Sequence, residues 1–547
     1  MNVIFRKNGI IIIFLILISI TSIFPYFFNN YIFSQDDLLF HRTRLESYTL
    51  AVKHLDFFPR IFPTMGLNFG YGADLFYPSI LLLPFALFRI GGFSFVSSYY
   101  LFQLFISFIT AIISYYFFYS IHHSKKSSLL FSCFYTLSTY RLIDQSVRAA
   151  LGETLAFAFL PLLVLGIYTL FYTHQHHWKL LAIGMSLLIA SHLITAFYSF
   201  LLLLIFLIFN WKKCKLAQLK SLTKAFLLTV GLSAWFLFPY LEQIEQLKFN
   251  FNNTTLWANG LHFSLGDLFI NSLTNLSAPF TELKPNIGLF LLVTIIAALF
   301  SYPKLTKTNQ RLTLLTLFVI LLATNLFPWA FFKTSILATI QFPWRLLLFA
   351  SFFASLLAVY LIEQFQLDSK KEFLIFIALS IFLTIGFNSN NLVQARIQNN
   401  VTVTNENFSD FYESEIGHGK EYLVKDTDFK KYFASPALII DGVPSTTNFS
   451  DPSSNKYNYN HFTLRTNGTQ EVQLPKFFYK GYEVIDNQKV IPNYNKAGLV
   501  TVKLNEGEHA LSISYKKTLV QKISVIFSIL IFGILCFQYI GKKILNK

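Results

Sequence analysis

Long apolar runs recur along this 547-residue chain and constrain its fold more than any other feature. The runs Gly9–Phe28, Thr154–Tyr172 and Leu180–Phe209 contain no Asp, Glu, Lys or Arg. Stretches of this length and composition are typical of helices that cross a bilayer. With 54% hydrophobic and 13% charged residues and a mean hydropathy of +0.50, the chain is expected to be a polytopic α-helical membrane protein.

Basic residues lie mostly in the short segments between the apolar runs. If these segments are cytoplasmic, the chain has about twelve spans with both termini inside the cell. Orientation in the membrane then explains the net charge of +16, and no nucleic-acid partner is expected. The predicted spans are Gly9–Phe28, Val96–Ile121, Ser127–Tyr140, Thr154–Tyr172, two within Leu180–Phe209, one ending at Tyr240, Ile287–Ser301, Leu312–Ala330, Leu346–Ile362, Phe373–Phe387 and Leu519–Ile540.

The composition changes after residue 388. Polar residues replace the apolar runs, and short alternating stretches are separated by Gly and Asn turns, which predicts an extracytoplasmic domain rich in β-strand over 389–518. We therefore expect a multi-spanning domain over 1–388, with a first outer loop at 29–78. A final transmembrane helix and a basic cytoplasmic tail follow over 519–547. The three cysteines are far apart, so neither a disulfide framework nor a thiolate metal site is indicated.

The run Leu180–Phe209 has basic segments on both sides, which predicts two spans that meet at Ser191 and His192. His192 would then lie on the outer side, near the first loop. The alternative is an intramembrane histidine that is hydrogen-bonded to a neighbouring helix. The sequence leaves both alternatives open.

The most polar stretch of the membrane part is Ser34–Pro78. If it is helical, Asp37, His41, Arg44 and Tyr48 fall on one face, so that a carboxylate, an imidazole and a guanidinium group lie together. Such a face is typical of a catalytic or binding site. The alternative is a helix whose mixed charges face solvent or lipid headgroups.

Two further features of this stretch favour a site. Asp36 and Asp37 are adjacent, and neighbouring carboxylates raise one another's pKa, so the pair suggests a proton, a cation or a metal ion as partner. The glycine and aromatic run that follows is typical of a close-fitting turn whose rings line a polar pocket. Tyr71 and Tyr77 are its candidate substrate contacts.

Further ionisable residues are predicted on the same outer face. Charge gathered at one interface is expected of an enzyme that acts on a lipid-linked substrate, whereas a transporter buries charge at the midplane of broken helices. A carboxylate such as Asp37 could accept the proton of an incoming hydroxyl, and Arg148 or Arg345 could hold a departing phosphate. The candidate substrate-binding residues are His41, Arg44, Tyr71, Tyr77, Arg148, Glu153, His192 and Arg345.

Short motifs spread over most of the chain match one bacterial family. They are Asp37-Leu-Leu-Phe-His41-Arg-Thr-Arg44, Asn68-Phe-Gly-Tyr-Gly72, Phe76-Tyr-Pro78, Tyr140-Arg-Leu-Ile-Asp144, Val147-Arg-Ala-Ala-Leu-Gly-Glu153, Ser191-His-Leu-Ile-Thr195, Gln341-Phe-Pro-Trp-Arg345, Leu474-Pro-Lys-Phe-Phe-Tyr-Lys-Gly-Tyr482 and Leu504-Asn-Glu-Gly-Glu-His509. On these motifs the chain resembles the 6-pyruvoyl-tetrahydropterin-synthase-related, or YfhO-like, membrane proteins, which belong with the C-type glycosyltransferases.

The resemblance implies an outer catalytic cleft among many helices, a polyprenyl-phosphate sugar as donor and an aspartate of the first outer loop as general base. Asp37 fits that position best, and Asp36 is the competing choice. No metal ligands are assigned, although the paired aspartates permit a divalent cation such as Mg²⁺ or Mn²⁺. The chain departs from the family at Tyr479-Lys-Gly-Tyr482, where such tails more often read Tyr-Pro-Gly-Trp. The ligand of the outer domain could therefore differ from that of the family.

We therefore expect a glycosyltransferase of the bacterial cytoplasmic membrane whose active site is extracytoplasmic. It would move a sugar from the lipid-linked donor to a cell-envelope polymer or glycolipid, with membrane lipids around it. The alternatives are a transporter or flippase of a lipid-linked saccharide and a non-catalytic scaffold of envelope assembly.

Overall fold

The structure is a computed structural model of the 547-residue chain. It describes residues 9–33, 36–173, 177–253, 262–276, 283–397, 402–410, 413–417, 419–425, 427–434, 437–445 and 459–545. Ser34 and Gln35 of the predicted first loop, parts of the predicted outer domain and the last two residues therefore lie outside the described residues. The chain divides into a first unit, Met1–His41, Gly91–Phe226 and Thr254–Phe408, and a second unit, Arg42–Ile90, Leu227–Asn253 and Ser409–Lys547.

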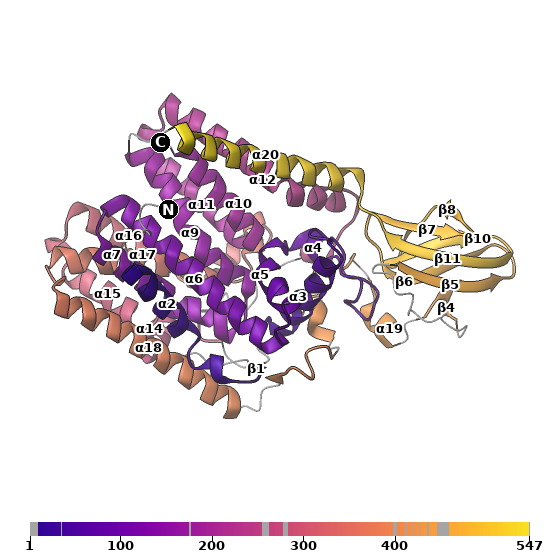
Figure 1. Ribbon diagram of the computed structural model, residues 1–547, viewed down its shortest axis with the longest axis horizontal. Coiled ribbons are helices and arrows are strands. Elements are labelled where there is room, and N and C mark those ends of the chain that lie inside the picture. Colours follow the sequence, from indigo (N-terminus) through magenta and orange to yellow (C-terminus); the bar gives the residue numbers. More distant parts are fainter. Residues whose placement is uncertain are drawn as a thin grey trace. The chain divides into compact units, whose positions relative to one another are not determined.

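Helices make up nearly all of the first unit (Figure 1). Two short strands of this unit pair antiparallel, with Ile32 opposite Val403. The elements are α2 (Gly9–Ile23), η1 (Tyr26–Phe28), β1 (Ile32–Phe33), α6 (Phe95–His122), α7 (Lys125–Thr136), α8 (Thr139–Leu142), η3 (Ile143–Val147), α9 (Leu151–Tyr172), α10 (Trp178–Ser191), α11 (Leu193–Phe209), η4 (Trp211–Lys213), α14 (Leu265–Thr274), α15 (Leu289–Phe300), η6 (Tyr302–Lys304), α16 (Lys307–Ala323), η7 (Trp329–Phe332), η8 (Ile336–Ile340), η9 (Pro343–Leu346), α17 (Leu347–Gln364), α18 (Lys370–Ile397) and β2 (Thr402–Val403).

Six helices among the described residues are long and apolar enough to cross a membrane, and five shorter helices are also apolar. The six are Phe95–His122, Leu151–Tyr172, Leu216–Gln246, Pro343–Gln364, Lys370–Ile397 and Leu519–Tyr539. A helix occurs at each of the predicted spans, so the polytopic helical class is supported. The predicted number of about twelve spans is not confirmed, because the other helices are too short or too polar to meet the same criterion.

Helices α9 and α10 pack very closely. A Cβ atom at Gly166 would lie 2.3 Å from the backbone nitrogen of Leu181, and one at Gly184 would lie 2.6 Å from that of Leu163. Glycine at both positions therefore lets the two backbones approach, which is a common device between membrane helices. Because α10 ends at Ser191 and α11 begins at Leu193, the predicted division of the long apolar run is confirmed.

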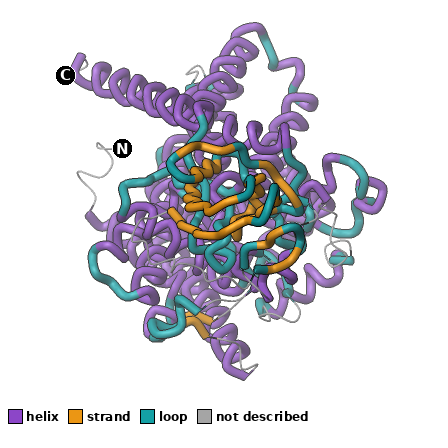
Figure 2. Tube along the Cα trace, turned by 90° about the vertical axis from the view of Figure 1, so that its right-hand side faces the viewer, coloured by secondary structure: helices purple, strands orange, loops and turns teal. Residues whose placement is uncertain are grey.

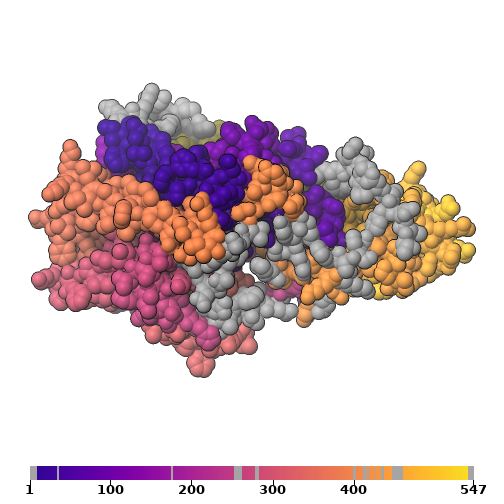
Figure 3. Space-filling view, turned by 90° about the horizontal axis from the view of Figure 1, so that it is seen from below, coloured from indigo at the N-terminus to yellow at the C-terminus, as the bar shows by residue number. Residues whose placement is uncertain are grey.

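The end of α2 packs on α18, and their surfaces adjoin in Figure 3, where α2 is indigo and α18 is orange. Asn388 Nδ2 donates hydrogen bonds to the carbonyl oxygens of Ser22 (3.1 Å) and Phe24 (2.8 Å). Because Asn388 is a buried residue in the middle of α18, the helix continues to Ile397 and passes the boundary predicted at residue 388. Asparagine suggested a loop, but here it satisfies carbonyl groups that the end of α2 leaves free.

The second unit combines helices with two antiparallel sheets, whose strands gather together in Figure 2. The sheet orders are β4-β3-β6-β10-β9 and β5-β11-β7-β8, which agrees with the predicted β-rich region. The division between the units falls within two helices: α3 (Leu38–Lys53) has its residues up to His41 in the first unit, and α12 (Leu216–Gln246) has its residues up to Phe226 there. The other elements are α4 (Ala73–Phe76), η2 (Ile80–Leu82), α5 (Leu83–Ile90), η5 (Asn250–Asn253), η10 (Glu413–Ile416), α19 (Phe429–Ala434), β3 (Ile439–Ile440), β4 (Val443–Pro444), β5 (Tyr459–Thr466), β6 (Gln470–Phe477), β7 (Tyr482–Asp486), β8 (Lys489–Ile491), β9 (Tyr494–Lys496), β10 (Leu499–Leu504), β11 (Gly507–Tyr515) and α20 (Leu519–Leu545).

The glycine and aromatic run of the first loop packs on the β-rich part of the second unit. The backbone nitrogen of Phe477 donates to the carbonyl oxygen of Phe69 (3.0 Å), and the two rings stack with their centres 5.1 Å apart. A Cβ atom at Gly72 would lie 2.6 Å from the ring of Tyr479. The absence of a side chain at Gly72 therefore lets the loop lie directly against an aromatic ring.

Candidate active site

The segment between α8 and α9 forms the centre of a charged cluster in the first unit. Helix α8 continues into the π-helix η3, and the backbone nitrogen of Arg148 bonds the carbonyl oxygen of Ile143 (2.8 Å). Ala149 then takes a left-handed conformation with φ of 55°, and α9 starts at Leu151. A wide π turn followed by a reversal is frequent at functional sites, and a left-handed alanine is a strained conformation that the surrounding structure must hold.

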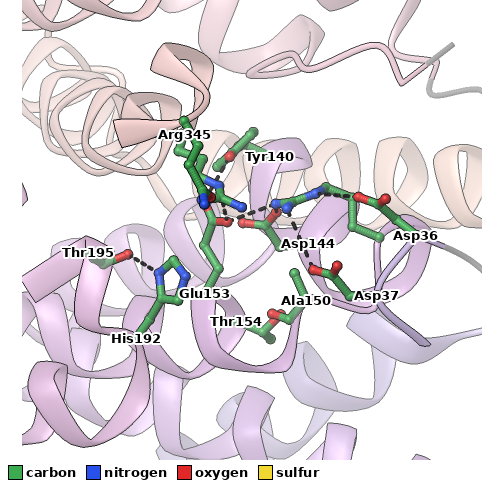
Figure 4. A network of polar contacts seen from close by, with 12 residues as sticks. Asp36, Asp37, Tyr140, Asp144, Ala150, Glu153, Thr154, His192, Thr195 and Arg345 are labelled. Carbon is green, nitrogen blue, oxygen red and sulfur yellow. Dashed lines mark hydrogen bonds and ion pairs between the residues drawn. The ribbon is translucent and has the colours of Figure 1, made fainter. Parts of the chain in front are cut away.

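Arg148 lies at the centre of this cluster, and its side chain is 2% exposed. Nη1 donates to Asp144 Oδ1 (2.6 Å) and to Glu153 Oε2 (2.8 Å). Nε donates to Asp36 Oδ2 (3.3 Å), and Nη2 lies 3.8 Å from Asp37 Oδ2. All four carboxylates therefore gather around one guanidinium group (Figure 4).

Residues around α9 and α17 complete the cluster. The hydroxyl of Tyr140 donates to Glu153 Oε1 (2.8 Å), and Arg345 Nε lies 3.7 Å from Glu153 Oε2. The ring of Trp344 covers the guanidinium group of Arg148, with 4.9 Å between the ring centre and Cζ. An aromatic face over a cation stabilises it and excludes water.

Asp36 and Asp37 form the accessible edge of the cluster, with side chains 49% and 39% exposed. Both precede α3, and the backbone nitrogen of Asp37 donates to the carbonyl oxygen of Arg148 (2.9 Å). Partial withdrawal from water and repulsion by Asp36 raise the pKa of Asp37 to about 7, although Arg148 and Arg345 act in the opposite direction. Asp37 is thus a carboxylate that solvent reaches and that titrates near neutrality.

Asp144 is the most enclosed carboxylate of the cluster, with no exposed side-chain surface. Burial, followed by repulsion from Glu153, raises its pKa well above the usual range. Within the described residues its Oδ2 atom has no hydrogen-bond partner. A protonated Asp144 would reduce the surplus of negative charge that four carboxylates leave against the two guanidinium groups of Arg148 and Arg345.

His192 occupies the junction between α10 and α11 and is half-buried. Its Nδ1 atom lies 2.7 Å from Thr195 Oγ1 at the start of α11. Figure 4 shows this pair on the Glu153 side of the cluster. The helix junction therefore brings His192 near the charged residues, whichever side of the membrane it faces.

Three other candidate residues make their contacts in the second unit. Arg44 Nε donates to Ser79 Oγ (3.2 Å), Nη2 donates to the carbonyl oxygen of Tyr77 (3.1 Å), and the guanidinium group lies over the Tyr77 ring at 3.9 Å. Tyr71 is fully buried; its hydroxyl donates to the carbonyl oxygen of Ile416 (2.8 Å) and accepts from the backbone nitrogen of Tyr422 (3.1 Å). These contacts stabilise the loop and leave Tyr71 no surface for a substrate.

The expectation of one functional face on α3 is corrected in part. The helix begins at Leu38, so Asp37 precedes it. The carbonyl oxygen of Asp37 accepts the first helical hydrogen bond, from the backbone nitrogen of His41 (3.0 Å). His41 is 2% exposed. The hydroxyl of Tyr48 donates to the carbonyl oxygen of Phe57 (3.2 Å). The buried side of α3 therefore serves packing.

Sequence reasoning did not choose Asp144, Tyr140 or Trp344 as site residues. Asp144 precedes Arg148 by four residues, and this spacing of opposite charges was an available signal. Tyr140 and Trp344 belong to motifs that the family resemblance rests on, but an aromatic residue beside an apolar run usually serves packing, so neither was assigned to the site. No three His, Cys, Asp or Glu side chains of the described residues are arranged to hold a metal ion, so the divalent cation stays a prediction.

Apolar helices together with a buried cluster of ionisable residues define a membrane protein with a candidate polar site. A family model described as bacterial membrane protein YfhO matches residues 67–409, and the chain belongs to this family. The predicted resemblance is thereby confirmed. An uncharacterized protein of Lactococcus lactis subsp. cremoris (strain MG1363) is 27% identical over 338 residues, which are 58% of this chain and 54% of that protein. The match thus spans about half the length of the curated relative.

Proposed function

We propose that the protein transfers a sugar from a polyprenyl-phosphate donor to a hydroxyl group of a cell-envelope polymer or glycolipid on the outer face of the cytoplasmic membrane. The observation that carries this proposal is the accessible carboxylate of Asp37, held beside Arg148 within a cluster that also contains Arg345. Membership of the YfhO family supports a membrane location. We also retain about twelve spans with both termini in the cytoplasm.

In the proposed reaction the acceptor oxygen attacks the anomeric carbon and forms the new glycosidic bond. The bond from that carbon to the phosphate oxygen breaks, and polyprenyl phosphate leaves with the bonding electrons. Asp37 takes the proton of the acceptor hydroxyl as general base. Inversion at the anomeric carbon follows from attack opposite to the leaving group, and it rests on the resemblance to the C-type glycosyltransferases.

Asp37 is preferred to Asp36 as the base. Asp36 accepts a hydrogen bond from Arg148 Nε (3.3 Å). The Asp37 carboxylate lies 3.8 Å from Arg148 Nη2, which is too far for a hydrogen bond. A pKa of about 7 also suits a group that must accept a proton at neutral pH.

The test is Asp37→Asn in the producing cells, with Asp36→Asn as matched control and with expression confirmed by immunoblot. Mass spectrometry would compare envelope polymers and polyprenyl-phosphate sugars in the two strains. We expect Asp37→Asn to lose a sugar from an envelope polymer or glycolipid while a lipid-linked sugar accumulates, and Asp36→Asn to keep the decoration. Unchanged decoration in Asp37→Asn would reject the assigned base and favour a transporter or scaffold.

A further inference from the structure

Arg148 is occupied by the protein's own carboxylates. Its three guanidinium nitrogens face Asp36, Asp37, Asp144 and Glu153 at 2.6–3.8 Å, and its side chain is 2% exposed. A phosphate competing for this group would have to displace the buried Asp144 or Glu153, or else the partly exposed Asp36 or Asp37. Leaving a buried carboxylate without its cation is costly, so Arg148 is a poor ligand for a substrate anion.

Arg345 has a different environment. Its side chain is 11% exposed, and Nη1 donates to the neutral amide oxygen of Gln341 (2.9 Å). Nε lies 3.7 Å from Glu153, too far for a hydrogen bond, and has no other partner among the described residues. Nε is itself buried, but the side chain as a whole is more exposed than that of Arg148 and has a neutral hydrogen-bond partner, so Arg345 is the better ligand for an anion.

Arg148 instead holds Asp37 at two points. Its carbonyl oxygen accepts from the backbone nitrogen of Asp37 (2.9 Å), and its Nη2 atom faces the Asp37 carboxylate (3.8 Å). The strained turn at Ala149 follows directly and turns the chain into α9. The backbone contact places the residue, and the side-chain contact restrains the direction of its carboxylate.

We propose that Arg148 positions Asp37 and does not bind the donor phosphate, an inference that rests on the proposed transferase function. Asp144 and Glu153 hold the guanidinium group from its buried side, and Trp344 covers its face. Arg345 remains as the residue for the leaving phosphate. Arg148 thus acts on the reaction through Asp37 and is a positioning residue.

The charged groups that face Asp37 give this role a measurable signature. They are Asp36 on the same turn, Arg148 before α9, Glu153 on α9 and Arg345 on η9, with Asp144 behind Arg148. Arg148 is the strongest of the groups that lower the pKa of Asp37. Loss of its charge should raise that pKa by about one unit or more, whereas loss of a phosphate ligand should weaken donor binding.

The test uses purified full-length protein in lipid nanodiscs and polyprenyl-phosphate sugars extracted from cells that lack the protein. Transfer is followed against pH and donor concentration. For Arg148→Gln we expect the rising limb to move upward by about one pH unit or more with KM for the donor unchanged, and Arg148→Lys should restore most of the limb position. For Arg345→Gln we expect KM for the donor to rise about tenfold or more.

The positioning role would be overturned if Arg148→Gln raised KM for the donor as much as Arg345→Gln does and left the rising limb of the pH–rate profile at the wild-type position. If size-exclusion chromatography shows that Arg148→Gln does not fold, Arg148→Lys decides. A lower kcat with unchanged KM supports positioning, and a raised KM with unchanged kcat contradicts it. Asp37→Asn separates the two proposals: transfer at the wild-type rate rejects the transferase mechanism, whereas an inactive Asp37→Asn beside a raised KM in the Arg148 variants rejects only the positioning role.

Discussion

The carboxylate of Asp37 is subject to opposing influences. Limited hydration and the neighbouring Asp36 raise its pKa, while Arg148 and Arg345 lower it, and the balance lies at about 7. A base with this pKa is partly deprotonated at neutral pH and still accepts a proton readily. Its reactivity therefore depends on the charges around it as much as on its position.

We predict that the transfer rate rises with pH through about 7, because only deprotonated Asp37 can accept the acceptor proton. Asp36→Asn removes a repelling charge, so the pKa of Asp37 falls and the rising limb moves to lower pH. Initial rates of the purified wild type and of Asp36→Asn between about pH 5 and 9 would measure the rising limb of each protein. An Asp36→Asn limb at the wild-type position would contradict the coupling between the two aspartates.

Tyr140 offers a test of the buried side of the cluster. Tyr140→Phe removes the hydroxyl that bonds the ionised, 2% exposed Glu153, and we expect the free energy of unfolding to fall by about 1.5–3 kcal/mol. Tyr135→Phe is the matched control, because that hydroxyl donates to the neutral carbonyl oxygen of Phe157 (2.8 Å), and about 0.5–1.5 kcal/mol should be lost. Unfolding in detergent would measure both, and equal losses would argue against an ionised Glu153.

The sequence indicated which charged side chains form the cluster better than it indicated the groups that each side chain contacts. Asp37, Arg148, Glu153 and Arg345 were expected to lie together, and the structure brings them into one cluster. Arg44 was predicted to bind substrate, but its guanidinium group donates to the backbone carbonyl oxygen of Tyr77. Backbone partners leave no mark in a sequence, because every residue carries the same donor and acceptor.

Helices α9 and α10 pack together, with Glu153 in the first turn of α9 and His192 directly after α10, and the two residues lie near one another in Figure 4. We predict that Gly166→Ala and Gly184→Ala each lower the free energy of unfolding by about 1–3 kcal/mol, because the new methyl group meets backbone atoms within 2.6 Å. Gly386→Ala in α18 is the control, since nothing lies within 4 Å of its Cβ position. Thermal unfolding in detergent measures the three variants, and a neutral Gly166→Ala would contradict the close packing.

Element boundaries were predicted well where composition changes within an apolar run and poorly where polar residues are buried. The break at His192 was found because basic flanks required two helices. The end of α18 was missed because Asn388 and Asn391 resemble loop residues. Both are buried, and Asn391 donates to the hydroxyl of Tyr26. A buried amide with a distant partner cannot be told from a turn residue by local pattern.

For the whole molecule, the proposal requires the aspartate edge to face outward. In a variant without the native Cys133, Cys214 and Cys536, we predict that Asp36→Cys reacts with a membrane-impermeant maleimide on intact cells, because Asp36 is 49% exposed. Lys125→Cys is the control; its segment is predicted to be cytoplasmic, so it should react only after permeabilisation. Labelling of Lys125→Cys alone on intact cells would reverse the topology.

The second unit shows what sequence patterns could not supply. The first loop and the β-rich region are separated by some four hundred residues, yet Phe69 pairs with Phe477 and Gly72 lies against Tyr479. The spacing of apolar residues and the composition predict local structure, whereas such pairing depends on the complementary shapes of distant segments. The helical class and the β-rich region were therefore predictable, and the association of the loop with the β-rich part was not.

Sugar transfer by the purified full-length protein would show the proposed activity itself. Wild-type protein and Asp37→Asn would be incubated in nanodiscs with polyprenyl-phosphate sugars and envelope acceptor, both extracted from cells that lack the protein, and followed by mass spectrometry. We predict that only the wild type consumes a lipid-linked sugar and adds its mass to the acceptor, releasing polyprenyl phosphate. Equal consumption by Asp37→Asn, or none by a folded wild type, would contradict the account.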